Sequence, residues 1–582
     1  MSCLSVSCVL LVLHCASYLL FVIKSAIYAS LKMDQLPEES RCVVDIKDGP
    51  ICGYVDKLGE RSYYKFKSIP YAKPPVGQLR FLPPSPISPW TELKDCTIDA
   101  PEPIYCDLEG IKGSEDCLYI EISTPDLTPD KPLPVMFWFG CFKFACTIDK
   151  MLDPTLINDQ NVVYVRCGFR MGVFGFLSMN DIMAPGNAGL KDVVMALKWM
   201  QNNISFFGGD KDNVTIFGTS SGGAIVHLLM LSPMATGFFH KAIIQSGCAL
   251  NIWSLTKNPF QPVMELAKGL GLSTTNNIEI LEELKTLPSE DIIKAEIFNC
   301  ETEINYHNIF DTNFKPSVED EFEGQPAFLT KSPHNIIRSG NFNKVPLIIG
   351  SNNIEGSLIK YITSDFYNFE KYNENVQLLV PKSLAGEEKM SVAIGHQLLK
   401  FYLGEDEAFT KDTQNQYLQL ISDYYFLYYV NNTVRLHSKV APNSPIYYYI
   451  ANYCGEWAVP EYLKIFNSGG HISELPFIFG IKESDKQYKG SRDSIRTRAR
   501  VVKMWTNFAK YGNPTPDEDD PLLQIKWDPV ESENKLNYLS IGSELTKGRN
   551  PFYDRMTFWD NLHKEHAFLR VLMYFNDLGV SW

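Results

Sequence analysis

The chain has 582 residues, of which 45% are apolar, 21% charged and 13% aromatic, so it contains ample material for a large hydrophobic core. This composition excludes an intrinsically disordered protein. The formal net charge is -14 and the acidic residues are scattered along the chain, which argues against a surface that binds nucleic acid through its phosphates.

An apolar run occupies residues 8–23 near the N-terminus. It is shorter than the roughly 20 residues that a membrane-spanning helix needs, so we interpret residues 1–29 as a signal peptide of a secreted protein. The run lacks a preceding basic segment, and Lys24 follows it, so a retained anchor formed by residues 8–23 is an alternative. Initiation at Met33, which would give a cytoplasmic protein, is another. The preferred interpretation implies no firm membrane association.

Short apolar runs alternate with helical patterns along the remaining chain. Residues 43–99 combine β-prone stretches with Pro and Gly, which predicts strands and turns at one end of a sheet. Buried strands are predicted at residues 117–122, 134–139, 162–165, 214–217, 345–349 and 445–451, with a helix over 187–202 and a helix-rich stretch over 390–440. This alternation predicts an α/β fold with a central, mostly parallel sheet covered by helices on both faces. No long linker interrupts it, so we expect a single domain over residues 40–582.

The segment Gly218-Thr-Ser220-Ser-Gly222 has the pattern GxSxG and lies between a predicted strand and an apolar helix. In that context the pattern indicates a sharp turn that exposes a nucleophilic serine, with glycines where side chains would collide. A serine hydroxyl is a weak nucleophile and needs a histidine base, which a carboxylate in turn orients. We therefore predict Ser220 as the nucleophile.

Chain order helps to choose the base and the acid, because hydrolases with this turn present the serine first, then the acid, then the histidine. His471 follows two glycines in a loop, Ser468-Gly-Gly-His-Ile-Ser, where a base can be displayed. Glu355 lies just beyond the predicted strand at 345–349, and catalytic groups gather at the carboxyl ends of parallel strands. His227, in the helix after the serine, is predicted to be packed instead.

The sequence resembles the carboxylesterase and cholinesterase family, and within it most resembles insect carboxylesterases. The motifs that carry the resemblance are SIPYAKPPVGQLRF, SEDCLYI, GFRMGVFGFLS, NAGLKDVVMALKWMQNNISFFGGDKDNVTIFG, LSPMATGFFHKAIIQSG, GSNNIEG and GGHISELPFIFG. The resemblance implies an α/β-hydrolase fold, a small-molecule ester as substrate, no cofactor, and Ser220, Glu355 and His471 as catalytic triad. It also implies a disulfide between Cys106 and Cys117 and structural ion pairs between Arg80 and Glu115 and between Arg170 and Asp192.

The sequence departs from the family at the glycine-rich loop whose backbone amides form the oxyanion hole. Here the stretch reads Phe139-Gly-Cys-Phe-Lys-Phe-Ala-Cys146. An ungapped alignment would put Phe142 and Lys143 in the hole, where their side chains would fill space that a substrate needs. We prefer a two-residue gap, which makes Gly140 and Cys141 the donors beside the amide of Ser221. Since loss of one donor costs about 100- to 1,000-fold in rate, the shortened loop raises the question of weak activity.

Further features bear on substrate and compartment. Thr219 stands where relatives commonly carry glutamate, and no tryptophan precedes SEDCLYI where cholinesterases hold choline, so choline esters are disfavoured. The serine motif also differs from the Gly-Gln-Ser-Ala-Gly of juvenile hormone esterases.

Eleven cysteines follow the N-terminal run without zinc-site spacing, so no metal site is predicted. Three glycosylation motifs begin at Asn203, Asn213 and Asn431.

Two functions follow from these observations. The first is hydrolysis of small or lipid-like apolar esters, of odorant, pheromone or xenobiotic type, through an acyl-enzyme. The rival is an inactive family member that serves in binding or adhesion, which the altered oxyanion loop favours and the retained triad opposes. The sequence makes no prediction of the oligomeric state.

Overall fold

The computed structural model describes residues 40–577 except 108–109, 301–309, 311, 363–368, 382, 386, 405–407, 458–467, 482–488 and 518. The expected signal peptide and the alternative start at Met33 lie outside the described residues. Among the described helices none has both the length and the apolar composition to cross a membrane.

A 13-stranded sheet runs through the molecule in the order β1-β2-β3-β7-β10-β8-β11-β12-β13-β14-β16-β17, with β4 beside β2. Its centre consists of parallel strands: β10 (Val163–Cys167), β8 (Leu133–Cys141), β11 (Gly209–Ser220), β12 (Lys241–Gln245), β13 (Leu347–Asn352), β14 (Ile446–Ala451) and β16 (Asn537–Ile541). These bounds confirm the predicted buried strands to within a few residues, except that β8 and β11 extend further than expected.

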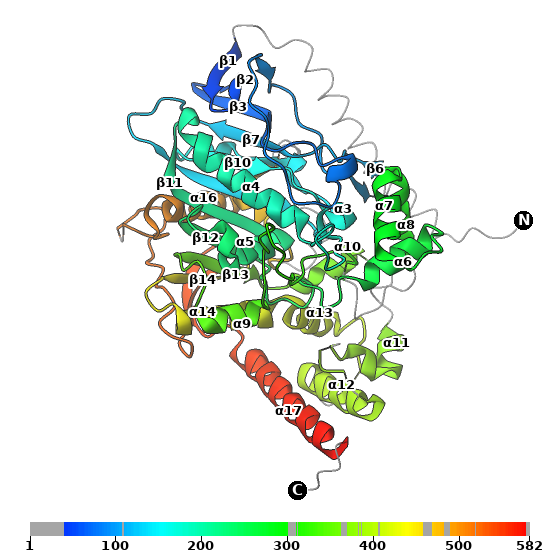
Figure 1. Cartoon of the computed structure of the whole chain (residues 1–582). Coiled ribbons are helices and arrows are strands. Elements are labelled where there is room, and N and C mark those ends of the chain that lie inside the picture. The colour runs from blue at the N-terminus through cyan, green and yellow to red at the C-terminus, as the bar shows by residue number, and fades with distance from the viewer. Residues whose placement is uncertain are drawn as a thin grey trace, which may run out of the picture.

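Antiparallel strands flank this parallel centre. On one side lie β1 (Arg41–Ile46), β2 (Gly49–Leu58), β3 (Arg61–Pro70) and β7 (Tyr119–Thr124), and on the other β17 (Leu545–Arg549). The Pro- and Gly-punctuated stretch near the N-terminus therefore forms one end of the sheet, as predicted (Figure 1).

Helices pack on both faces of the sheet, which confirms the α/β prediction. On one face α4 (Ala188–Asn203) and α5 (Ser221–Leu231) join a core cluster that includes Phe137, and on the other α16 (Arg492–Tyr511) joins a cluster that includes Trp138. Successive strand residues point to opposite faces, so Phe137 and Trp138 serve different clusters. Both faces of β8 are thus apolar and buried, as in parallel sheets generally.

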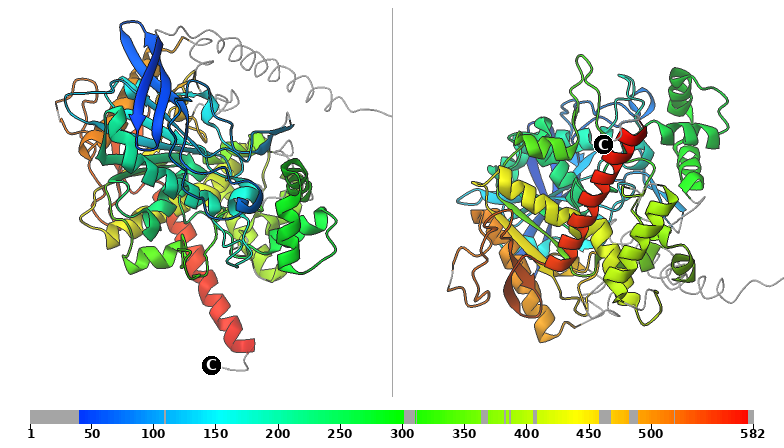
Figure 2. Two further views of the ribbon diagram at one scale, coloured as in Figure 1. Left: turned by 45° about the horizontal axis from the view of Figure 1, so that its top comes forward. Right: turned by 90° about the horizontal axis from the view of Figure 1, so that it is seen from below.

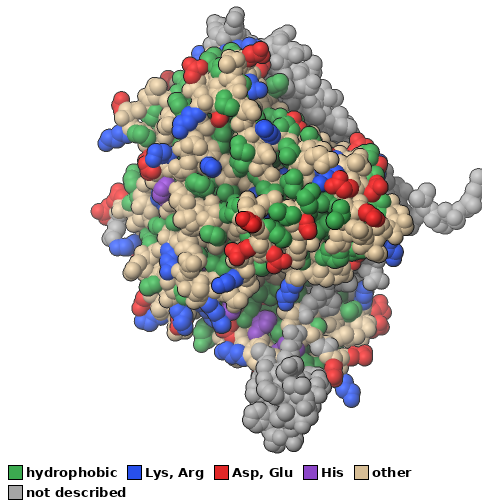
Figure 3. All heavy atoms as spheres, in the orientation of Figure 1, with side chains coloured by type: hydrophobic (Ala, Val, Ile, Leu, Met, Phe, Trp, Pro, Cys, Tyr) green, Lys and Arg blue, Asp and Glu red, His purple; other side chains and the backbone are tan. Residues whose placement is uncertain are grey.

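Further helices lie between β13 and β14 in the chain. The expected helix-rich stretch contains α12 (Glu388–Leu403), α13 (Gln414–Ser422), a π-helical turn (Asp423–Leu427) and α14 (Tyr428–Val440). The last helix, α17 (Tyr553–Asp577), extends away from the layered body (Figure 2). Side chains of both charge signs are spread over the face drawn in Figure 3.

Candidate active site

The candidate nucleophile lies at the junction of β11 and α5. Ser220 is the last residue of β11 and has φ 57° and ψ -125°, a backbone conformation that L-residues rarely adopt. The chain turns so tightly here that a Cβ added to Gly222 would lie 2.0 Å from the carbonyl oxygen of Phe139. The glycine is therefore required sterically. The turn aims the hydroxyl of Ser220 away from the sheet, and 8% of the residue's surface is exposed.

Three predicted side chains meet at this turn. The Nδ1 atom of His471 lies 2.6 Å from Oε2 of Glu355, and its Nε2 atom lies 3.0 Å from Oγ of Ser220. Because Nδ1–H of His471 donates a hydrogen bond to the carboxylate, Nε2 carries no proton and can accept a hydrogen bond from the hydroxyl of Ser220. His471 and Glu355 are 1% and 0% exposed, so water does not compete for these bonds.

The loops that carry the acid and the base support each other. The backbone N–H of Ile354 donates to the carbonyl of Gly469 over 2.9 Å, and the N–H of His471 donates to Oγ of Ser357 over 3.2 Å. The second carboxylate oxygen of Glu355 accepts the N–H of Asn352 over 2.6 Å. Both side chains are therefore fixed by backbone contacts, which reduces the reorganisation that a proton transfer would need.

The sequence analysis missed a second buried carboxylate, Glu474. It accepts hydrogen bonds from Thr219 Oγ1 at 2.8 Å, Asn352 Nδ2 at 2.6 Å and Gln245 Nε2 at 3.2 Å. Burial and the nearby charge of Glu355 raise the pKa of Glu474. A signal existed, because Glu474 is the acid in the otherwise apolar segment after His471, and Thr219 supplies a hydroxyl where relatives carry glutamate.

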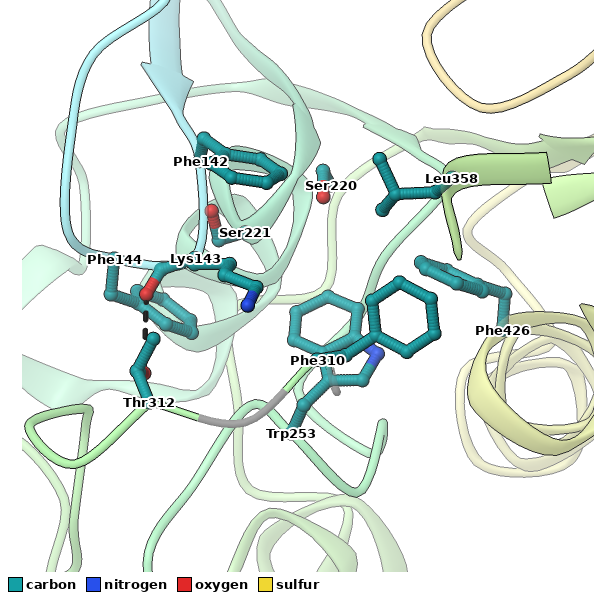
Figure 4. Close-up of a pocket in the computed structure, with 10 residues that line it drawn as sticks. All are labelled: Phe142, Lys143, Phe144, Ser220, Ser221, Trp253, Phe310, Thr312, Leu358 and Phe426. Carbon is teal, nitrogen blue, oxygen red and sulfur yellow. Dashed lines mark hydrogen bonds between the residues drawn. The ribbon is translucent and has the colours of Figure 1, made fainter. Parts of the chain in front are cut away.

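A small cavity opens beside Ser220. Its wall is mainly aromatic and aliphatic, with a lysine and two hydroxyl side chains besides the serine: the lining residues are Phe142, Lys143, Phe144, Ser220, Ser221, Trp253, Phe310, Thr312, Leu358 and Phe426 (Figure 4). Two of the rings are fixed by the π-helical turn, since Trp253 Nε1 donates to the carbonyl of Tyr425 over 2.9 Å and Phe426 belongs to the turn itself. Phe426 also packs on the His471 ring, with centroids 4.9 Å apart.

The cavity wall next to the serine is a tight turn at residues 142–146, which we call the Phe142–Cys146 turn. The N–H of Phe142 donates to the carbonyl of Cys146 over 2.8 Å, and the N–H of Gly172 donates to the carbonyl of Phe144 over 2.8 Å. Lys143 and Phe144 have φ of 55° and 60°, in the left-handed region that favours glycine. Two non-glycine residues are thus held in a conformation that only glycine adopts without steric cost. Each such residue costs about 1–2 kcal/mol, so the surroundings must stabilise the turn.

The predicted oxyanion-hole donors Gly140 and Cys141 lie within strand β8 and not in a loop. Strand β8 does not end at Phe139 but continues to Cys141, because its ladder with β11 pairs Gly140 with Thr219 and Cys141 with Ser220. Both residues are therefore sheet residues and neither lines the cavity. The chain leaves the sheet only at Phe142. Of the three predicted donors, Ser221 alone lines the cavity, at the first residue of α5.

The expected disulfide between Cys106 and Cys117 is absent from this structure. Cys117 is a free thiol, 1% exposed in the first core cluster, and burial raises its pKa well above the ordinary value. Cys106 packs against the border of that cluster from a two-stranded hairpin of β5 (Tyr105–Asp107) and β6 (Gly110–Lys112), and its Sγ donates to the carbonyl of Asp107.

Two of the three glycosylation candidates are buried, which corrects their prediction. Asn203 is 1% exposed and its amide contacts Lys47 N, Asp48 and Trp199 O, whereas Asn431 is 3% exposed within α14. A glycan needs a surface asparagine, so neither fits. Asn213 is half-buried and its side-chain oxygen accepts a hydrogen bond from Lys241.

The two predicted ion pairs and the packed position of His227 are confirmed. Arg80 binds Glu115 through two hydrogen bonds of 2.7 and 2.6 Å, and Arg170 binds Asp192 through two of 2.8 and 2.7 Å. His227 is completely buried, as expected of a packed residue. No group of three or more His, Cys, Asp and Glu side chains in the described part of the chain has an arrangement suited to a metal ion.

Comparisons with known proteins identify similar esterases. The model of the carboxylesterase family matches residues 40–559, a range that contains Ser220, Glu355 and His471. The juvenile hormone esterase of Tribolium castaneum is 32% identical over 565 residues, covering 89% of this chain and 93% of that protein. Venom carboxylesterase-6 of Apis mellifera is 34% identical, covering 88% and 93%. The crystal structure of juvenile hormone esterase from Manduca sexta, with OTFP covalently attached, is similar with a TM-score of 0.78 and 27% identity, covering 90% of this chain and 100% of that one.

Proposed function

This chain belongs to the carboxylesterase family and is a serine carboxylesterase, and from this premise we propose that it cleaves carboxylic esters through an acyl-enzyme formed on Ser220. The observation that carries the proposal is the continuous chain of hydrogen-bond distances, 2.6 Å from Glu355 to His471 and 3.0 Å from His471 to Ser220. A base within hydrogen-bond reach of the nucleophile and oriented by a carboxylate is the arrangement that serine hydrolysis needs.

In the first half of the reaction, Nε2 of His471 takes the proton of the Ser220 hydroxyl while Oγ bonds to the ester carbonyl carbon. Glu355 stabilises the imidazolium that forms. The proton on Nε2 then passes to the leaving alcohol as the carbon–oxygen bond of the ester breaks, and the acyl group stays on Ser220. In the second half, water gives a proton to Nε2 and bonds to the acyl carbon. The bond between that carbon and Oγ then breaks, Nε2 returns its proton to Oγ of Ser220, and the carboxylic acid is released.

We assign the oxyanion contacts of this reaction to the backbone N–H groups of Ser221 and Lys143. Ser221 begins α5, where the N–H groups and the positive end of the helix dipole favour negative charge. Lys143 also lines the cavity and, in the ungapped alignment, replaces a family glycine. The N–H of Phe142 is already committed to Cys146, so the turn offers fewer donors than a glycine-rich loop would.

The cavity suits an apolar substrate. Five aromatic side chains and Leu358 form most of the wall, and such surfaces bind hydrocarbon groups by removing them from water. We therefore propose small or lipid-like apolar esters, of odorant, pheromone or xenobiotic type. Because Phe142 and Lys143 narrow the space beside the serine, a short acyl group is favoured over a long one.

A rival function is ligand binding or adhesion without turnover, and one observation favours it: bulky side chains at 142 and 143 occupy the place of family glycines beside Ser220. Hydrolysis of a short-chain nitrophenyl ester by the purified chain, compared with a Ser220→Ala variant, separates the two functions. The proposal predicts that the variant loses at least about 10⁴-fold in kcat. Absence of hydrolysis above background in the unaltered chain would instead support the binding protein.

We also propose that the chain is secreted after removal of residues 1–29, on the strength of the apolar run at 8–23. N-terminal sequencing of protein recovered from the medium of secreting cells tests this. Recovery of an intact residue 8–23 segment in a membrane fraction would contradict it and favour the anchor.

A further inference from the structure

Asp149 is a buried carboxylate that the proposed reaction does not use, yet it packs against the strand end beside Ser220. It begins a short 3-10 helix (Asp149–Met151) and is 7% exposed. Its Oδ1 accepts a hydrogen bond from Trp138 Nε1 over 2.8 Å, and its Oδ2 lies 3.3 Å from Nη1 of Arg166. Burial of a carboxylate is costly, so these partners offset an appreciable penalty.

This carboxylate explains why position 140 is a glycine. A Cβ added to Gly140 would lie 1.8 Å from Oδ1 of Asp149 and 2.6 Å from Nε1 of Trp138. Only glycine leaves room for the carboxylate at this point of β8. Gly140 and Asp149 therefore meet at the base of a loop, and the Phe142–Cys146 turn lies within that loop.

The carboxylate is itself held by a line of alternating charges that crosses the sheet. Arg166, on β10, binds Glu121 of β7 through Nε at 2.8 Å and Nη2 at 2.6 Å, and Glu121 binds Lys67 of β3 at 2.6 Å. Glu121 is 6% exposed, so the line is largely shielded from water. Such networks specify one geometry, because any displacement leaves a buried charge without its partner.

We propose that Asp149 is a positioning residue of the ester-hydrolysing site, which closes the base of the loop and so holds the Phe142–Cys146 turn beside Ser220. The inference rests on the proposed function of that turn. A turn with two non-glycine residues in the left-handed region persists only when its surroundings over-determine it. One end of the loop is fixed by the ladder of β8 with β11, and Asp149 fixes the other end.

The test compares Asp149→Asn with Glu121→Gln. The first variant keeps an oxygen for Trp138 but removes the charge that Arg166 binds, whereas the second weakens the same network one step farther from the turn. Amide hydrogen exchange of the peptide spanning residues 142–146 is measured beside kcat, KM and the affinity for a trifluoromethyl ketone, whose tetrahedral adduct places a negative oxygen in the oxyanion hole.

We expect Asp149→Asn to speed exchange in the turn by about 10-fold and to lower kcat and the affinity for the ketone by a similar factor, with KM within about 2-fold. Glu121→Gln should lower the Tm but leave turn exchange and kcat within about 2-fold. Trp138→Phe, which removes one donor to the carboxylate, should act in the same direction as Asp149→Asn with a smaller effect, and it serves if Asp149→Asn does not fold.

Unchanged turn exchange and kcat in both Asp149→Asn and Trp138→Phe would overturn the inference. So would an equal loss in Glu121→Gln, because the network would then act only on general stability. A chain without esterase activity would refute the proposed function alone, since hydrogen exchange of the turn still decides whether Asp149 holds it.

Discussion

The two sides of the Ser220 cavity are built in different ways. On one side, Glu355 and His471 lie on loops after parallel strands, and short hydrogen bonds between those loops fix them without backbone strain at either residue. On the other side, the Phe142–Cys146 turn holds Lys143 and Phe144 in a conformation that favours glycine. The proton-transfer side therefore depends on local motifs, whereas the oxyanion side depends on distant contacts that compensate for unsuitable residues.

The proton-transfer side is expected to show the largest effect. Glu355→Gln should lower kcat by about 10³- to 10⁴-fold, because a glutamine amide facing Nδ1 favours the wrong tautomer of His471. Steady-state hydrolysis of a nitrophenyl ester measures this. Glu474→Gln is the matched control, a buried carboxylate that does not touch His471 in the structure, and we expect about a 10-fold loss or less. Equal losses of kcat in the two variants would contradict the assignment of Glu355, and not Glu474, as the carboxylate that orients His471.

The oxyanion side should respond through substrate size. Lys143→Gly removes bulk beside Ser220 and suits φ of 55°, so kcat/KM for a hexanoate ester should rise about 10-fold relative to an acetate ester. Lys143→Met keeps the bulk and removes the charge, and its acyl preference should match that of the unaltered chain. A changed preference in Lys143→Met would show that charge, and not space, controls the acyl group.

A smaller effect is expected from a histidine pair beneath the nucleophile helix. Nε2 of His227 lies 3.0 Å from Nε2 of His437, and Nδ1 of His227 accepts the N–H of Ala249. Burial lowers the pKa of His437 to about 4 and that of His227 well below its ordinary value. In the unfolded chain both histidines have an ordinary pKa near 6.5, so below that pH the unfolded chain binds protons that the folded chain does not. The free energy of unfolding is therefore unaffected by the pair above pH about 6.5 and decreases as the pH falls towards 4.

The variant His437→Gln tests this pair, because a glutamine side chain can still accept a hydrogen bond from Nε2–H of His227 but does not titrate. Between pH 7 and pH 5 the unaltered chain should lose about 2 kcal/mol more stability than the variant, a difference of about 2 °C in Tm by thermal unfolding. Equal losses in the two proteins would mean that one of the buried imidazoles is already charged at neutral pH.

The contrast between the two sides also separates what the sequence predicted from what it did not. Ser220, Glu355 and His471 were found because each lies in a short motif after a buried strand, and chain order fixed their roles. The start of the Phe142–Cys146 turn differs from the prediction because Gly140 and Cys141 pair with Thr219 and Ser220 and so extend β8 by two residues. This pairing depends on β11, a strand distant in sequence, which a local pattern does not reveal.

The same physical reason explains the other corrections. Burial of Asn203, Asn431 and Cys117 is set by packing between segments far apart in the chain, which a three-residue motif or a cysteine spacing does not encode. In sequence, Gly140 resembles part of a glycine loop, whereas in the structure this glycine leaves room for the carboxylate of Asp149. Strands and helices, by contrast, follow from local hydrophobic periodicity and were placed with small errors at their ends.

The most direct test of the central claim is the intact mass of the purified chain after treatment with an organophosphate that carries a fluoride leaving group. A nucleophile activated by His471 and Glu355 displaces fluoride, so we predict one phosphoryl adduct per chain, located on Ser220 by peptide mapping and absent from His471→Ala. A chain that stays unlabelled, or that labels equally without His471, would contradict an activated serine at this site.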